Sequence, residues 1–277
     1  MWLNMAREDY QKALKKGERS YARYLSEGKY PYLQVLEELL SHTDVVAEED
    51  LGICSIPSEM IVGTFTAGRR TAFAPNFMPL LDDESEFAAK WQTLYNAHLE
   101  EGIHDPIKCY EFMNRYYVLE GNKRVSVLKF CGAPSVQGNV TRIIPKRTDE
   151  PENRLYFEFL AFYKCSKVNY IVLSKLGSYR TLLEKLGFEV DYKWTDDDRM
   201  EVRNVCVAKL VRGHMEVQTI HMVRGAFPMA SENGAGRITD VFPIHILVAD
   251  FLSCGVVLNM VPNSHKFSLR KGATLTI

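Results

Sequence analysis

The residues of this chain best suited to bind or transform a ligand form the run Gly121-Asn122-Lys123-Arg124. The run follows a strand-like segment and opens a segment with helical spacing, so it predicts a strand, a glycine turn and a helix. The first turn of a helix carries backbone N–H groups without intrahelical partners and the positive end of the helix dipole. Lys123 and Arg124 add two positive charges there. Together these features predict a phosphate-binding turn.

A plain surface turn with two solvated cations is the alternative interpretation. The chain contains three G-x-x-R patterns, at residues 121–124, 177–180 and 234–237. A pattern this short is expected about once by chance in a chain of this length. The residue pattern therefore leaves both interpretations open.

Glu120 and a pair of arginines are the other candidates for a site around this turn. Glu120 directly precedes the glycine, where a catalytic carboxylate could bind a magnesium ion or orient an attacking hydroxyl group. It could equally be a salt-bridge partner of the two cations. Arg69 and Arg70 lie in a segment of small residues and prolines, 66–77, that is expected to be a loop. Guanidinium groups suit phosphate oxygens, and solvated surface arginines are again the alternative.

The elements that must position these residues lie mainly between residues 106 and 144. Branched and aromatic residues predict strands at 107–112 and 116–119, joined as a hairpin. A short helix after the glycine turn stops at Cys131-Gly132, and a third strand-like run covers 136–144. The clearest helix is expected at 85–101, with Ser85 as its N-cap. The predicted fold class is therefore α/β (α+β), a small mixed sheet with flanking helices.

The outer segments predict further helices. Residues 4–27 and 31–42 have helical spacing and are expected to form an N-terminal helical hairpin. Beyond a charged linker, helices are expected at about 155–163, at 174–186 and after Thr195, with a strand at 168–173. The last of these helices begins with Asp196-Asp197-Asp198. A helix-turn-helix in this region would therefore present an acidic face, which does not suit the phosphates of DNA.

Residues 204–277 differ in composition from the rest of the chain. They contain four acidic and seven basic residues, a net charge of +3, against 31 acidic and 27 basic residues before them. Residues 241–261 are apolar enough to suggest a membrane span, but Asp250 near the middle costs about 3 kcal/mol in a bilayer. No fold is predicted for this segment.

Whole-chain composition narrows the range of functions. With 277 residues, 46% hydrophobic and 25% charged, the chain is expected to form one or two globular domains. A net charge of -1 gives no electrostatic reason to expect a nucleic-acid partner. The six cysteines show neither metal-ligand spacing nor a disulfide pattern, and the N-terminus is too charged for a signal peptide. A cytoplasmic location is expected.

Residues from about 51 to 144 resemble the N-terminal domain of ParB-type partition proteins of bacteria, which belongs to the ParB/sulfiredoxin superfamily. The order of parts carries the resemblance: a first strand with a proline, an arginine segment, an amphipathic helix, a hairpin and a G-x-x-R turn. Two motifs are similar to the family's "E-x-G-x-x-x-P-I" and "Y-x-[IVL]-x-[DE]-G-x-x-R": Glu101-Gly102-Ile103-His104-Asp105-Pro106-Ile107 and Tyr116-Tyr117-Val118-Leu119-Glu120-Gly121-Asn122-Lys123-Arg124.

The resemblance implies nucleotide or phosphate chemistry at the G-x-x-R turn: CTP binding and hydrolysis in partition proteins, ATP use in sulfiredoxins and phosphotransfer in related kinases. Sulfiredoxins place a reactive cysteine where this chain has Asn122, so thiol repair is not expected. Partition proteins carry a second motif, Glu-Asn-x-x-Arg, on a later helix. Here Glu152-Asn153-Arg154 has those residue types at a different spacing, which puts CTP in doubt.

Longer relatives of this domain appear fused to a periplasmic-binding-like domain of the basic-membrane-protein, nucleoside-binding type. Residues 204–277 do not resemble that domain. The chain could therefore be a truncated relative of such a nucleoside-binding transporter lipoprotein fusion, or its reading frame could have changed.

The sequence thus predicts four parts: a helical hairpin at 1–44, a ParB-like domain at 45–148, an extension at 149–203 and a C-terminal segment at 204–277. The expected function is a cytoplasmic regulatory module that binds a nucleoside triphosphate, CTP or ATP with Mg²⁺, or another phosphorylated ligand at the turn, with or without slow hydrolysis. A phosphotransferase or nuclease of the same superfamily is one alternative. A DNA-binding partition or transcription-type regulator is another, and a homodimer is compatible with each.

Overall fold

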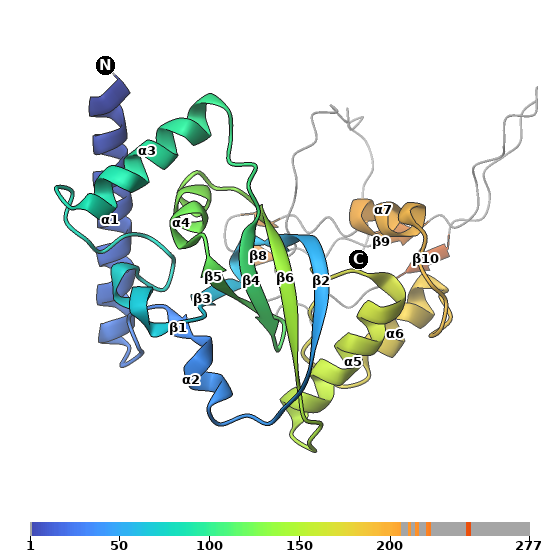
Figure 1. The fold of residues 1–277 in the computed structure, drawn as a ribbon. Coiled ribbons are helices and arrows are strands. Elements are labelled where there is room, and N and C mark those ends of the chain that lie inside the picture. The colour runs from blue at the N-terminus through green and yellow to red at the C-terminus, as the bar shows by residue number, and fades with distance from the viewer. Residues whose placement is uncertain (1, 206–209, 212–213, 216–219, 223–241, 245–277) are drawn as a thin grey trace, which may run out of the picture.

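The computed structural model describes residues 2–205, 210–211, 214–215, 220–222 and 242–244 (Figure 1). Most of the 204–277 segment, including the apolar run 241–261 apart from its residues 242–244, lies outside the described residues. The described elements in chain order are α1 (Trp2–Ser26), β1 (Gln34–Val35), α2 (Leu36–Leu40), β2 (Val45–Pro57), η1 (Ser58–Met60), β3 (Ile61–Thr64), η2 (Ala67–Ala72), α3 (Glu86–Glu100), β4 (Ile107–Phe112), β5 (Arg115–Glu120), α4 (Asn122–Phe130), β6 (Ser135–Pro145), α5 (Pro151–Ser166), α6 (Ser178–Leu186), α7 (Asp196–Val205), β7 (Leu210–Val211), β8 (His214–Met215), β9 (Ile220–Met222) and β10 (Phe242–Ile244).

A six-stranded mixed sheet organises the chain, with strand order β1-β3-β5-β4-β6-β2. β4 and β5 form an antiparallel hairpin, while β4 pairs with β6 and β5 pairs with β3 in parallel. β2 and β6 form a long antiparallel ribbon at one edge. The prediction of a mixed sheet with flanking helices is confirmed.

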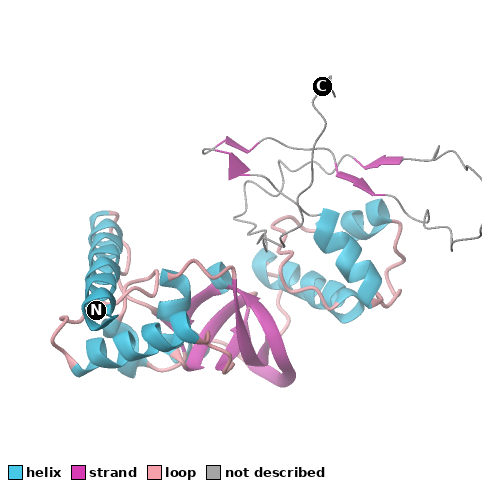
Figure 2. Ribbon diagram, turned by 90° about the horizontal axis from the view of Figure 1, so that it is seen from above, coloured by secondary structure: helices cyan, strands magenta, loops and turns pink. Residues whose placement is uncertain are grey.

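The strands lie between two groups of helices (Figures 1 and 2). On one side, α4 packs on the sheet and α3 and α1 pack outside it, which buries one apolar cluster that joins strands and helices. Tyr10 of α1 meets Trp91 of α3 edge to face, with ring centroids 5.4 Å apart. Trp91 in turn donates its indole N–H to the Ser126 hydroxyl of α4 at 3.0 Å. These contacts fix α4, the helix that carries the predicted phosphate turn.

The predicted N-terminal helical hairpin is wrong. The first helix forms as expected, but its buried face packs against α3 rather than against a second helix. After Gly28 the chain extends to β1, whose two residues join the sheet beside β3, and only five residues then form α2. The backbone at Gln34 approaches so closely that a Cβ at Gly63 would lie 2.3 Å from the Gln34 carbonyl oxygen. Leu33 and Leu36 are buried beside this edge strand, whereas Leu39 is exposed, so the four leucines do not form the single buried helix face that was expected.

The predicted elements around the turn agree with the structure. α3 begins after Ser85, whose hydroxyl accepts a hydrogen bond from the Ala88 N–H at 3.1 Å. The hairpin between β4 and β5 turns at Met113 and Asn114, both with positive φ, and α4 ends at Phe130, followed by Cys131 as the C-cap and Gly132 at positive φ. The 66–77 segment is less irregular than expected, because Ala67–Ala72 forms the 3₁₀ helix η2.

The α5–α7 helices bury their own apolar cluster on the other side of the strands. The predicted strand at 168–173 is wrong. Its apolar residues are buried among these helices, and the Tyr179 hydroxyl hydrogen-bonds the Leu173 N–H and the Ile171 carbonyl at 3.0 and 3.3 Å. The branched residues that suggested a strand are thus explained by burial among helices, and the segment does not pair with another strand of the described structure. No helix in the described part of the chain is long and apolar enough to cross a membrane.

Candidate functional site

The predicted phosphate turn joins β5 to α4 through Gly121. This residue has φ +108° and forms the N-cap, and as a glycine it has no side chain that could accept a hydrogen bond from the first turn of the helix. A Cβ at this position would lie 2.7 Å from the Ile107 side chain, so both the backbone conformation and the packing require glycine. No acidic residue lies in the first turn of α4. The free N–H groups and positive dipole end of α4 therefore have no anionic partner from its own first turn.

Arg124 is engaged within the protein through one nitrogen of its guanidinium group. Its Nη1 donates hydrogen bonds to the carbonyl oxygens of Asp105 and Pro106, both at 2.8 Å. These carbonyls belong to the segment that leads into β4. The guanidinium group thus links the start of α4 to the start of β4. Both acceptors are neutral carbonyl oxygens, so this contact forms without an anion.

Glu120 lies away from the turn. Its carboxylate pairs with Lys108 Nζ at 3.0 Å, and both side chains are more than half exposed. Lys108 alternates along β4 with Ile107 and Cys109, which pack in the cluster that contains α4. The ion pair therefore lies on the opposite face of the sheet from α4. The salt-bridge interpretation of Glu120 holds, but with Lys108 as the partner instead of Lys123 or Arg124.

The magnesium ion expected at Glu120 fits this arrangement poorly. Glu120 is a single exposed carboxylate that already pairs with a lysine. It also lies on the opposite face of the sheet from α4, so it could not hold a magnesium ion that is bound to phosphates at α4. Within the described ranges, no three His, Cys, Asp or Glu side chains are grouped so that they could hold a metal ion.

Lys123 and Arg69 form the positive part of the turn. Lys123 Nζ lies 4.9 Å from the centroid of the Phe87 ring. Partial burial lowers the pKa of Lys123, and the positive charges of Lys90 and Arg69 lower it further, while Glu86 opposes the shift. Lys90 of α3 and Arg69 of η2 therefore lie close enough to affect the charge of Lys123, and Lys90 also forms an ion pair with Glu86.

The remaining predicted residues have different environments. Asn122 donates from Nδ2 to the Thr64 hydroxyl at 3.3 Å, while its Oδ1 is buried and has no hydrogen-bond partner among the described residues. Arg70 forms an ion pair with Glu38 of α2 and lies over the Tyr30 ring at 5.8 Å. The arginine pair thus divides: Arg69 is exposed near Lys123, and Arg70 serves the packing of α2.

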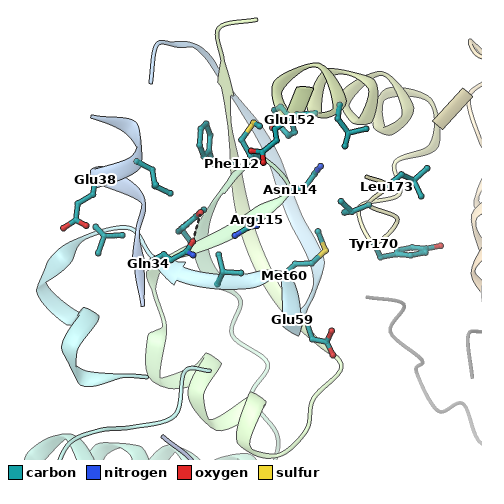
Figure 3. A pocket seen from close by; sticks show the side chains of 18 of the residues that line it. Gln34, Glu38, Glu59, Met60, Phe112, Asn114, Arg115, Glu152, Tyr170 and Leu173 are labelled. Atoms are coloured by element: carbon teal, nitrogen blue, oxygen red, sulfur yellow. Dashed lines mark hydrogen bonds between the residues drawn. The ribbon is translucent and has the colours of Figure 1, made fainter. Parts of the chain in front are cut away.

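A cavity of about 930 Å³ opens at the other end of β5, around the β4–β5 turn, and sequence reasoning missed it (Figure 3). Its wall includes aromatic residues and the hydrogen bond from the Tyr117 hydroxyl to Gln34 at 3.4 Å. The charged side chains of the wall are Glu38, Glu59, Glu152 and Arg115. The three carboxylates lie apart around the cavity in Figure 3, and a net negative wall does not suit a phosphate.

A buried ion pair joins the sheet to α5 and was also missed. Arg142 of β6 and Glu111 of β4 are each 1% exposed and pair through Arg142 Nε. The Tyr156 hydroxyl of α5 donates to Glu111 Oε2 at 3.1 Å. Burial raises the pKa of Glu111, and Arg142 opposes that shift. A signal was present in the sequence, because strand alternation places both charges on inward positions of neighbouring strands.

No family model, no characterised protein and no solved structure matches this chain in sequence or fold. The resemblance to the ParB/sulfiredoxin superfamily therefore rests on the motif series and stays a prediction.

Proposed function

We propose that this protein binds the phosphate groups of a nucleoside triphosphate or of another phosphorylated ligand at the N-terminal end of α4. The observation that carries the proposal is that Lys123, Lys90 and Arg69 gather around the single carboxylate of Glu86, beside a helix end whose N-cap residue is a glycine. Like charges held together in this way are relieved by an anion.

The roles of the residues follow from their contacts. The backbone N–H groups of Asn122, Lys123 and Arg124 supply hydrogen-bond donors at the helix end. Lys123 and Arg69 neutralise the phosphate charge. The Arg124 guanidinium holds the turn in place through the carbonyls of Asp105 and Pro106, so in this proposal it is a positioning residue.

The series of motifs indicates which class of ligand to expect. Its similarity to ParB/sulfiredoxin proteins favours CTP or ATP, with any Mg²⁺ carried mainly by the phosphates and water. The proposal is for binding rather than fast turnover, because the carboxylate predicted to be catalytic, Glu120, is engaged with Lys108 on the opposite sheet face. A cytoplasmic regulatory role follows from the same resemblance.

Thermal unfolding with each of the four ribonucleoside triphosphates and Mg²⁺ tests this function. A ligand at about 100 times its dissociation constant stabilises a folded protein by roughly 2.7 kcal/mol. We expect stabilisation by at least one nucleotide, and its loss in Lys123→Gln and Arg69→Gln. Arg70→Gln and Lys108→Gln are the charge-matched controls, because neither side chain lies at the α4 end.

Two results would overturn the proposal. One is the absence of stabilisation by any of the four nucleotides. The other is stabilisation that the Lys123 and Arg69 variants retain in full, since the ligand would then bind elsewhere.

A further inference from the structure

A second cavity lies where the β2–β6 ribbon meets α5 and α7. Its volume is about 590 Å³, which is within the range for sites that hold small molecules. The strands contribute Glu49 and Arg142, α5 contributes Tyr163 and Lys164, and the segment before α7 contributes Trp194. The cavity is separate from the turn at Gly121, which lines no part of it.

The charges that line this cavity are strongly unequal. Five are positive, on Arg142, Lys164, Lys167, Lys193 and Arg199, and one is negative, on Glu49. Arg142 has its counterion in Glu111, and Arg199 has its own in Asp196. Lys164 and Lys193 form no ion pair with any described residue. A cavity with this balance attracts anions.

Two side chains of the wall also have buried donors without partners. Arg142 is 1% exposed, and its Nη2 has no acceptor among the described residues. Trp194 is 4% exposed, and its indole Nε1–H has none in the same part of the chain. The Arg142 guanidinium lies 4.2 Å from the Tyr163 ring centroid and 3.7 Å from Glu49, and both of these residues line the cavity.

Buried donors without acceptors are costly, typically about 1–3 kcal/mol each. Glu111 accepts from the Nε of Arg142 and Glu49 lies 3.7 Å from its Nη1, so Nη2 is the guanidinium nitrogen that has no acceptor among the described residues. A ligand oxygen would satisfy these donors, for which the described residues provide no acceptor. The same oxygen would also balance the excess of lysines.

We propose that this cavity binds a small oxyanion, a phosphate-bearing or carboxylate-bearing molecule. Arg142 and the Trp194 indole N–H donate hydrogen bonds to it, and Lys164 and Lys193 close over its outer side. This site is independent of the phosphate turn at α4.

The Trp194 indole signal provides the most direct test. The ¹⁵N-labelled full chain is titrated with inorganic phosphate, pyrophosphate and citrate, and the three tryptophan indole signals are followed by NMR. Trp194→Phe assigns the signal by its disappearance. We expect the Trp194 indole proton to move downfield with at least one anion, because its N–H gains an acceptor, while the Trp91 signal stays in place. A stronger response to citrate or to the phosphates distinguishes carboxylate from phosphate as the preferred group.

Variants of the exposed lysines show whether the anion occupies this cavity. Lys164→Gln and Lys193→Gln should each raise the dissociation constant, followed through the Trp194 indole signal, about two- to fivefold. Lys15→Gln, a charge-matched change on the exposed side of α1, should leave the constant unchanged. An indole signal that does not move with any of the three anions would overturn the proposal. So would affinities that fall equally in the Lys15 and Lys164 variants.

Discussion

At the scale of single residues, two adjacent cations at the start of α4 have different tasks. Arg124 donates hydrogen bonds to two backbone carbonyls, so its side chain holds the local structure in place. Lys123 lies over Phe87 and near Arg69, where no carboxylate of the first turn neutralises it. Sequence order alone could not make this distinction, because both residues follow the same glycine and differ only in the direction of their side chains.

Removing Arg124 should therefore weaken the fold even without ligand. We expect Arg124→Gln to lower the free energy of unfolding by about 1–2 kcal/mol, because the carbonyls of Asp105 and Pro106 lose their donor. Arg69→Gln, a change at an exposed arginine, should stay within about 0.5 kcal/mol of the parent. Urea denaturation of both variants provides the comparison. Equal stability of Arg124→Gln and the parent would contradict the positioning role.

The buried carboxylate of Glu111 makes a second prediction at this scale. Glu111→Gln removes the buried partner of Arg142 and leaves it only the half-exposed carboxylate of Glu49, 3.7 Å away, which should cost about 3–5 kcal/mol. Glu120→Gln breaks an exposed pair and should cost less than about 1 kcal/mol. The two variants carry the same chemical change, one at a buried site and one at an exposed site. Chemical denaturation measures the free energy of unfolding that each of them loses. Similar losses in both variants would show that the Glu111–Arg142 pair contributes little.

At the scale of elements, strong local patterns predicted α3, α4 and the β4–β5 hairpin, because their capping and turn residues agree with their tertiary packing. The predictions at 31–42 and 168–173 failed where apolar residues are buried by neighbours distant in sequence. β1 exists because Gly63 of β3 lets the Gln34 backbone approach, and the Leu173 segment is held by Tyr179. Such long-range contacts leave no periodic pattern in a single sequence.

The last turn of α4 predicts how stability changes with pH. Lys129 donates to the Ile61 carbonyl of β3 at 2.8 Å, with its ammonium group 4.8 Å from the Phe77 ring centroid. Burial lowers the pKa of Lys129 from 10.5 to about 8. In alkaline solution the unfolded state therefore binds more protons at this residue than the folded state does. Its contribution to stability thus rises as the pH increases from about 8 to about 10.

The measurement compares the parent with Lys129→Met in urea denaturation at about pH 7.5 and about pH 9.5. The free energy of unfolding of the parent, relative to the variant, should increase by up to about 2 kcal/mol over this range. A difference between the two proteins that is independent of pH would mean that the Lys129 ammonium group is well solvated in the folded state.

At the scale of the whole molecule, two apolar clusters meet at a charged contact. The sheet with α1, α3 and α4 forms one cluster, α5–α7 form the other, and the Glu111–Arg142–Tyr156 contact joins them. The turn at Gly121 lies at one end of β5, and both cavities lie nearer the end that carries the hairpin turn. The sequence motifs identified the turn, but they could not identify cavities whose walls combine residues from β2 to α7.

The central claim is that phosphate groups bind the N-terminal end of α4, and backbone amide NMR of the labelled chain tests it most directly. On titration with the nucleotide that gives the largest thermal stabilisation, we predict the largest shifts at the N–H groups of Asn122, Lys123 and Arg124. These shifts should be absent in Lys123→Gln and retained in Lys108→Gln. Binding that leaves these three amides unmoved, or that moves only residues around Arg142, would contradict the account and place the ligand elsewhere.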